Sequence, residues 1–286
     1  ILFGVVLVSL FVAVTLWKEK DRIDPGEVSG LSSEQKAKIR HFWEVYRRAG
    51  MLKQQGAWEK AASAFREALE IEPGHEDALY FLGNVLFELE RYEEAVAAWH
   101  RLAEVNPSSV RAYAQLGAIY SCGAPGAPFD LEVAERAFQR SLRINREETG
   151  PILKLGEVAV LKGDRDQALV HLMTVGRSNS RSIKVHYLVG YLRWLEGDPE
   201  SARAALQKGV GLSRATRTAG GRSGEGDTQK SGPMLAEGSG RKSFFTPYYM
   251  GLKAWPEEDV SVGRMKAEYQ GLNRALKEMK NRLEDE

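Results

Sequence analysis

Hydrophobic positions recur at helical spacing through most of the chain, and residues 76–109 show the pattern most clearly. Leu79, Leu82 and Leu86 are separated by three and four residues, so they lie along one face of a helix. A second apolar stretch follows and ends before Pro107, which cannot continue a helix. The pattern predicts two amphipathic helices that pack against each other.

Small residues recur at a fixed interval of 34 along the chain. Two parallel series keep this interval except for one shared step of 39: Ala49, Gly83, Gly117, Gly156, Gly190 and Ala61, Ala95, Ala134, Ala168, Ala202. The longer step predicts one insertion within residues 121–130, where Gly and Pro permit a loop between two helices. Small residues are expected where antiparallel helices approach closely, so the spacing predicts five helix pairs of one kind.

The second copy closely resembles the tetratricopeptide repeat. Its large, small and helix-ending positions match that family's pattern at Leu82, Gly83, Leu86, Tyr92, Ala95, Trp99 and Pro107. The other copies match less completely, and the fourth ends in Ser180 where proline is usual. The resemblance implies an all-α fold, a right-handed α-solenoid of about five helix-turn-helix units over residues 42–212. The expected units are 42–75, 76–109, 110–148, 149–182 and 183–212.

The first 17 residues carry no charge and are followed by the charged stretch KEKDR. As a helix they would span about 25 Å, slightly less than a bilayer core of about 30 Å. We therefore expect residues 1–17 to be a transmembrane anchor whose upstream flank is missing from this sequence. A cleaved signal peptide is the alternative, although no small-residue cleavage site precedes Trp17. Residues 18–41 then form a juxtamembrane spacer and a lead-in helix, opened by a capping box of Ser32 and Gln35.

The chain after the repeats differs in composition. Residues 213–243 are rich in Gly, Ser, Thr and charge, which predicts a flexible linker. Residues 244–286 combine an aromatic segment with a C-terminal helix that we expect to start near Pro256. The predicted docking residues are Phe244, Phe245, Tyr248, Tyr249, Trp255, Met265, Tyr269, Leu272, Leu276, Met279 and Leu283.

The apolar positions of this last helix, beginning at Val262, follow a heptad spacing and require a partner surface. That surface could belong to a second copy, to another subunit, or to unit five of the same chain. We expect docking, and we expect that removing residues 244–286 leaves the repeats folded but abolishes association with the partner.

Composition and charge narrow the possible functions. Forty basic and 39 acidic residues nearly cancel, so no overall field would hold a nucleic acid. A single cysteine, Cys122, allows neither an internal disulfide nor a paired-cysteine zinc site. The histidines are scattered, and nucleophiles, bases and metal ligands do not cluster in the sequence. We therefore expect no enzyme activity, catalytic residue, metal or cofactor.

The family's geometry implies a partner-binding groove lined by the first helix of each unit. Its exposed positions here are largely aromatic or apolar, as expected where a peptide or helix docks. The predicted groove residues are Trp43, Tyr46, Tyr80, Asn84, Phe87, Leu153, Val160, Tyr187, Tyr191 and Trp194. Whether this groove is open or self-occupied is left undecided by the sequence.

Certain relatives clamp the acidic tails of chaperones with Lys, Asn and Arg side chains. The corresponding positions here hold Tyr80, Asn84, Gln115, Gly150 and Lys154, so that class of partner is not expected.

Together these features predict a non-enzymatic, membrane-tethered protein-protein interaction scaffold or assembly factor. The expected setting, from resemblance, is a single-pass bacterial inner-membrane protein with its repeats in the periplasm. The alternative is a structural accessory subunit of a redox or photosynthetic membrane complex. The expected partners are other proteins, including membrane-complex subunits, and the lipid bilayer through residues 1–17.

Overall fold

The computed structural model describes residues 32–220, 243–253, 255 and 260–284. Within these ranges the chain forms twelve helices and no strand, which confirms the all-α solenoid-like architecture. The predicted anchor, most of the predicted linker and the side chain of Leu283 lie outside what the structure describes.

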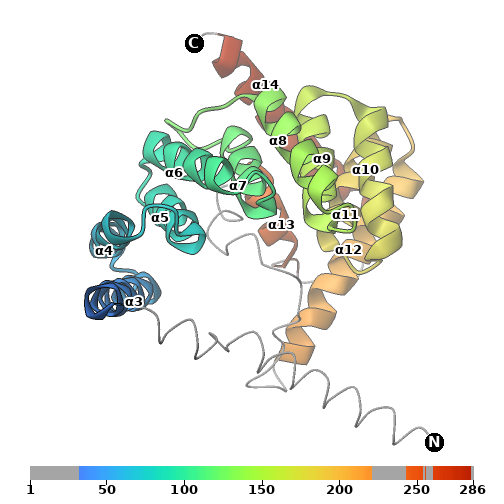
Figure 1. The fold of residues 1–286 in the computed structure, drawn as a ribbon. Helices are drawn as coiled ribbons and strands as arrows, with labels where there is room; N and C mark the ends of the chain where they lie inside the picture. Colours follow the sequence, from blue (N-terminus) through green and yellow to red (C-terminus); the bar gives the residue numbers. More distant parts are fainter. Residues whose placement is uncertain (1–31, 221–242, 254, 256–259, 285–286) are drawn as a thin grey trace, which may run out of the picture.

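Ten helices pair in chain order into five units (Figure 1). Unit one is α3 and α4, unit two α5 and α6, unit three α7 and α8, unit four α9 and α10, and unit five α11 and α12. Their bounds are α3 Ser33–Gln54, α4 Trp58–Ile71, α5 Glu76–Glu88, α6 Tyr92–Val105, α7 Val110–Tyr120, α8 Leu131–Ile144, α9 Thr149–Lys162, α10 Arg165–Ser178, α11 Ile183–Leu195 and α12 Pro199–Gly220.

Local side-chain contacts explain where several helices begin and end. The predicted capping box is present, because Ser32 Oγ accepts from Gln35 N and Ser32 N donates to Gln35 Oε1. The helix it opens runs without a break into unit one, so the expected lead-in helix and the first repeat helix are both α3. Asp130 caps α8 by accepting from two backbone N–H groups, and α9 ends at Gly163, whose φ of 84° is left-handed.

The small positions of the repeat are sites of close helix packing. A Cβ at Gly83 would lie 2.3 Å from Trp99 Nε1, and Trp99 is fully buried between α5 and α6. A Cβ at Gly117 would lie 2.7 Å from the ring of Phe138, at the equivalent place in unit three. In units two and three the 34-residue interval therefore marks where an aromatic ring of the second helix lies directly on the first helix; in unit four Leu172 takes this place over Gly156.

We expect Gly83→Leu to lower the free energy of unfolding by about 1–3 kcal/mol, because Trp99 occupies the space the new side chain needs. Urea unfolding followed by circular dichroism measures this. Gly50→Leu is the matched control, since a Cβ at Gly50 meets nothing within 4 Å. Equal midpoints for the two variants would contradict the packing described here.

The C-terminal region departs from the sequence-based boundaries. The last repeat helix does not stop at residue 212: α12 continues to Gly220, because Ser213 is buried and Arg214 Nη2 donates to the Trp255 carbonyl across 3.5 Å. The aromatic segment contains a short helix, α13 (Thr246–Lys253), that the sequence did not predict.

The final helix, α14 (Val262–Glu284), begins six residues after Pro256 and not beside it. Ser261 Oγ accepts from Arg264 N across 3.2 Å, so a serine provides the cap. Val262 is 44 % exposed and lies outside the buried seam, whereas the next five predicted seam positions are all buried. The buried seam therefore begins at Met265, one heptad position later than the sequence predicted.

The insertion in unit three is a loop between α7 and α8, as predicted. Cys122 in this loop forms an isolated antiparallel bridge with Ser243, where the chain returns. Phe244 lies against the same loop, since a Cβ at Gly123 would be 3.4 Å from its ring. We call residues 243–253, 255 and 260–284 the C-terminal segment. The start of this segment thus packs against the insertion.

Candidate protein-binding groove

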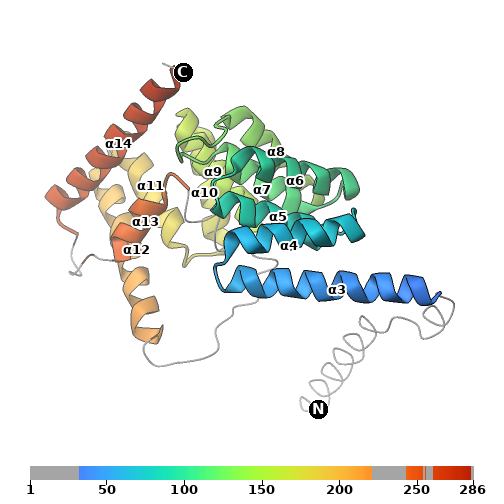
Figure 2. The same cartoon turned by 90° about the vertical axis from the view of Figure 1, so that its left-hand side faces the viewer.

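The C-terminal segment covers units four and five of the array. Figure 2 shows α13 and α14 beside α11 and α12, far from α3 and α4. Tyr269 of α14 is fully buried, and its hydroxyl donates to the Tyr187 carbonyl across 3.2 Å. A Cβ at Gly190 would lie 2.2 Å from the Tyr269 hydroxyl oxygen, so α14 packs directly on the backbone of α11. The predicted docking residues buried in the same core are Phe245, Tyr249, Trp255, Met265, Leu272, Leu276 and Met279, with Phe244 and Tyr248 packed at its edge.

Polar contacts fix the register of α14 on α11. Tyr187 donates to Glu268 Oε1 across 2.6 Å, and Tyr191 donates to Asn273 Oδ1 across 3.1 Å. These two tyrosines are 0 % and 3 % exposed. The sequence placed both in the partner-binding groove, and the structure shows that the chain's own α14 already covers them.

A second set of polar contacts, centred on Glu157, joins unit four to α13. Glu157 of α9 is buried, accepts from Tyr249 across 3.0 Å and pairs with Lys154 Nζ at 2.7 Å. Ser243 also donates to Glu157 across 3.3 Å. Sequence reasoning did not single out Glu157, and its position in an otherwise apolar helix face is the signal that could have found it. Of the remaining predicted groove residues in these units, Val160 is buried and Leu153 and Trp194 pack against the same core.

The groove of unit one remains open. Trp43 is 44 % exposed, and the half-buried Tyr46 lines a shallow pocket of about 630 Å³ together with Arg47, Lys53 and Phe81. Lys53 Nζ lies 4.0 Å from the centre of the Phe81 ring. Phe81 was not among the predicted groove residues, although it follows Tyr80 on the same helix.

The predicted groove residue Phe87 of unit two belongs to the core. Phe87 is 2 % exposed, and its ring centre lies 5.6 Å from that of Tyr92 and 6.1 Å from that of Trp99. Its side chain therefore packs between helices, which corrects the expectation that it faces a partner.

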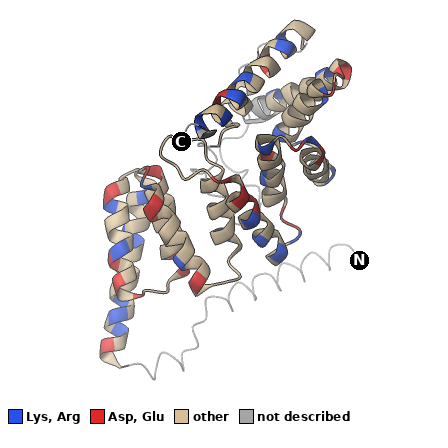
Figure 3. Cartoon of the chain, turned by 90° about the horizontal axis from the view of Figure 1, so that it is seen from above, with Lys and Arg blue, Asp and Glu red and all other residues tan. Residues whose placement is uncertain are grey.

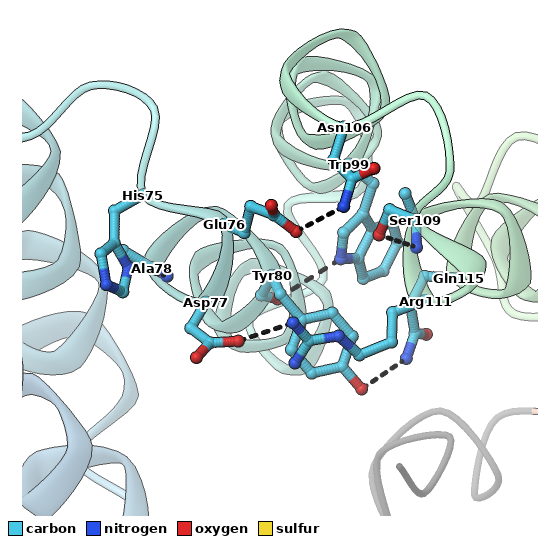
Figure 4. A network of polar contacts seen from close by, with 11 residues as sticks. His75, Glu76, Asp77, Ala78, Tyr80, Trp99, Asn106, Ser109, Arg111 and Gln115 are labelled. Atoms are coloured by element: carbon cyan, nitrogen blue, oxygen red, sulfur yellow. Dashed lines mark hydrogen bonds and ion pairs between the residues drawn. The ribbon is translucent and has the colours of Figure 1, made fainter. Parts of the chain in front are cut away.

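A polar network connects units two and three on the groove side (Figure 4). Arg111 Nη2 pairs with Asp77 at 2.6 Å, and its guanidinium lies 4.7 Å from the centre of the Tyr80 ring. Gln115 Nε2 donates to the Tyr80 hydroxyl across 3.2 Å, and Trp99 Nε1 donates to the Tyr80 carbonyl across 3.4 Å. Tyr80 is only 4 % exposed and belongs to the core of units one to three, so this predicted groove residue also packs mainly between helices.

Burial shifts the ionisation of the groove tyrosines. It raises the pKa of Tyr46 to about 12, with Asp77 adding to the rise and Arg111 opposing it. Burial likewise raises the pKa of Tyr191 to about 12, and raises the pKa values of Tyr187, Tyr249 and Tyr269 as well. All these hydroxyls stay protonated at neutral pH, as the hydrogen bonds donated by Tyr187, Tyr191, Tyr249 and Tyr269 require.

We expect the folded chain to lose stability above about pH 10. Tyrosine in the unfolded chain ionises near pH 10, whereas folded Tyr191 keeps its proton to about pH 12. The folded state then binds more protons, so the free energy of unfolding falls as pH rises, by about 1.4 kcal/mol per pH unit for each such tyrosine. Urea midpoints at pH 8 and pH 11 measure the loss, and Tyr191→Phe should reduce it. A midpoint independent of pH would contradict the buried tyrosine cluster.

Charges elsewhere are mixed. Basic and acidic residues are interspersed along the helices (Figure 3), and exposed pairs such as Arg66–Glu94 bridge neighbouring units at 2.7 Å. Across the described residues, no three His, Cys, Asp or Glu side chains gather in a way that could hold a metal ion. In the same part of the chain, no helix is both long and apolar enough to cross a membrane; residues 1–17 fall outside it.

Comparison with known proteins agrees with this architecture. Two tetratricopeptide repeat family models match the chain, one over residues 52–119 and one over residues 183–216. Residues 52–119 and 183–216 are therefore tetratricopeptide repeats, a kind of repeat that generally mediates protein-protein interaction.

The similar proteins are diverse. The chain is 28% identical over 134 residues to anaphase-promoting complex subunit 3 of Schizosaccharomyces pombe, and the match spans 46% of this chain but 19% of that subunit. A crystal structure of the MamA protein superimposes with a TM-score of 0.53 at 18% identity, covering 62% of this chain and 94% of MamA. PilF of Pseudomonas aeruginosa superimposes with a TM-score of 0.51 at 18% identity, covering 64% of this chain and 88% of PilF. Likeness at this identity defines the fold alone.

Proposed function

We propose that this chain is a protein-binding scaffold that takes a segment of another protein into the open groove of units one to three. The observation that carries the proposal is the contrast between the two halves of the array. Tyr187 and Tyr191 in unit five are covered by α14, whereas Trp43 in unit one is 44 % exposed beside an open pocket. An exposed tryptophan next to a preformed, partly apolar pocket is typical of an anchor point for a partner.

The proposal includes a membrane tether, supported by the uncharged residues 1–17. A tethered array would concentrate its partner at the membrane surface, and we place it on the periplasmic side of a bacterial inner membrane. Extraction of membranes at alkaline pH and N-terminal sequencing of the mature protein test this. A mature chain that starts after residue 17, or a chain released by alkaline washing, would remove the tether and leave the groove unaffected.

Affinity purification from the native source tests the groove. The full chain in mild detergent is compared with a Trp43→Ala, Arg47→Glu double variant, both of whose side chains are exposed. We expect the partner's recovery to fall at least tenfold, while Val170→Ala, at a 64 % exposed position outside the pocket, leaves it unchanged. Undiminished recovery with the double variant would overturn the proposal. Partners at fixed stoichiometry would favour the accessory-subunit role over an assembly factor.

A further inference from the structure

The pocket of unit one has an open gap between two basic side chains. Arg47, Gly50 and Lys53 follow one another at intervals of three residues, so they form one row along the groove side of α3. A Cβ at Gly50 would meet no atom within 4 Å, which leaves open space between the two cations. The pocket volume of about 630 Å³ lies within the range of about 300–1,000 Å³ that is typical of ligand pockets.

The floor of this pocket is aromatic and comes from three helices. Tyr46 of α3 and Phe81 of α5 are half-buried, and Phe65 of α4 is fully buried. The ring centre of Phe65 lies 6.0 Å from that of Tyr46 and 6.0 Å from that of Phe81, so the three rings form one continuous surface. A projecting apolar side chain can reach a floor recessed between helices, whereas a flat bilayer surface would contact only the rim.

The two cations at the rim have no acidic partner among the described residues. Lys53 Nζ lies over the Phe81 ring, and burial lowers the pKa of Lys53 because its ammonium is partly withdrawn from water. Arg47 Nε donates to the Trp43 carbonyl across 3.2 Å. Glu44 also lines the pocket, but it is exposed and forms an ion pair with neither cation. Both basic groups can therefore pair with carboxylates from outside.

The charge around this pocket differs from that of the rest of the chain. Arg48, next to Arg47, lies outside the pocket and is neutralised by Glu67. Over the whole of α3, six Lys or Arg residues stand against two Glu residues, although basic and acidic residues nearly cancel over the complete chain. The pocket thus combines an aromatic floor with a local positive potential, and such a surface attracts an acidic segment.

We propose that the pocket of unit one binds an acidic, apolar segment of the partner protein. A large apolar side chain of the segment enters the gap between Arg47 and Lys53, and flanking Asp or Glu side chains pair with these two cations. This inference rests on the proposed function and names the chemistry of its partner. The two cations lie on a single helix of unit one, so they are not the positions that clamp chaperone tails in relatives. The exposed Trp43, one turn before Arg47, extends the apolar contact on the same side of α3.

The test selects a random dodecapeptide library displayed on phage against the full chain in mild detergent. Enriched peptides are synthesised with an amidated C-terminus, so that only side-chain carboxylates contribute, and their dissociation constants are measured at 50 and 300 mM NaCl. We expect enrichment of sequences in which Asp or Glu flanks a large apolar residue. Their affinity should be at least threefold weaker at the higher salt concentration, because exposed ion pairs are screened by salt.

Three variants separate the charges from the gap. Arg47→Gln, Lys53→Met removes both charges but keeps most of each aliphatic stem, so it should weaken binding at least tenfold and abolish the salt dependence. Its matched control, Arg48→Gln, Lys60→Met, makes the same changes at exposed positions outside the pocket and should leave the affinity unchanged. Gly50→Leu fills the gap and should also weaken binding at least tenfold. Circular dichroism shows whether all three variants are folded.

Several outcomes would overturn the inference, and they separate it from the proposed function. Neutral or basic peptides that depend on Trp43 and Gly50 but not on the two cations would overturn the acidic segment and leave the groove's function standing. Peptides that bind independently of Trp43 and Gly50, or no enriched peptide at all, would overturn both.

Two further outcomes concern other occupants of the pocket. Phosphatidylglycerol micelles that bind through Arg47 and Lys53, without enrichment of any acidic peptide, would assign the two cations to a lipid surface and overturn the inference. Acidic peptides that bind only after residues 221–242 are replaced by a Gly-Ser segment of equal length would assign the pocket to the chain's own linker, and would likewise overturn a partner protein as its occupant.

Discussion

Deletion of residues 243–286 is expected to unfold units four and five while units one to three stay folded. The C-terminal segment shares one continuous core with these two units, including the fully buried Phe245, Met265, Tyr269 and Leu272. Each large apolar side chain contributes about 1.5–3 kcal/mol when buried, so the deletion removes more than about 5 kcal/mol. This differs from the sequence-based expectation that all repeats remain folded, because α14 is part of the core of unit five.

Circular dichroism and urea unfolding of the shortened chain measure this effect. We expect a lower helical content and a first transition at low urea, followed by the transition of units one to three. Adding a separate peptide of residues 243–286 should restore a single transition, because only non-covalent contacts hold the segment on the array. A shortened chain that unfolds at the original midpoint would show that α13 and α14 only rest on the array.

Tyr269→Ala is expected to cost about 3–5 kcal/mol, as for other large aromatic residues removed from a core. Tyr269 is fully buried, touches the rings of Tyr187, Tyr191 and Trp194, and covers Gly190. Its loss leaves a cavity between α11 and α14 that the backbone of Gly190 cannot fill.

Two further variants isolate the cause. Tyr269→Phe loses only the hydrogen bond to the Tyr187 carbonyl and should cost about 1 kcal/mol. Arg274→Ala, at an exposed position on the same helix, should change the midpoint little. If Tyr269→Ala and Tyr269→Phe had equal effects, the ring would not be packed as described.

The repeat architecture could be predicted because the small and large residues that pack its helices together recur at a fixed interval along the sequence. Gly83 and Gly117 keep the interval of 34 because each lies under an aromatic ring of the next helix, and Gly156 lies against Leu172 in the same way. The capping box at Ser32 and the loop at Cys122 were likewise readable from neighbouring residues.

The closure of the groove could not be predicted in the same way. Tyr187 and Tyr191 occupy groove positions in the sequence. They are covered by a helix whose contacting residues, Glu268 and Asn273, lie 81 and 82 positions further along the chain, and no residue near the two tyrosines indicates this. Phe87 was misplaced for a related reason: its position allows either a groove or a core contact, and the ring of Trp99 across the helix pair decides between them. The heptad spacing of the last helix indicated that it needs a partner surface, but not which of the candidate surfaces it covers.

The distance along the chain between Tyr191 and Asn273 has a consequence for synthesis. Eighty-two residues separate the two, and at about 5–20 residues per second a ribosome needs about 4–16 s to make them. Throughout that interval the aromatic face of unit five is uncovered, and any helix that presents a similar seam could bind there first. During synthesis the protein therefore passes through a stage in which its last repeat exposes an apolar surface that can bind other helices. That stage ends when its own C-terminal segment has been made and packs on this surface.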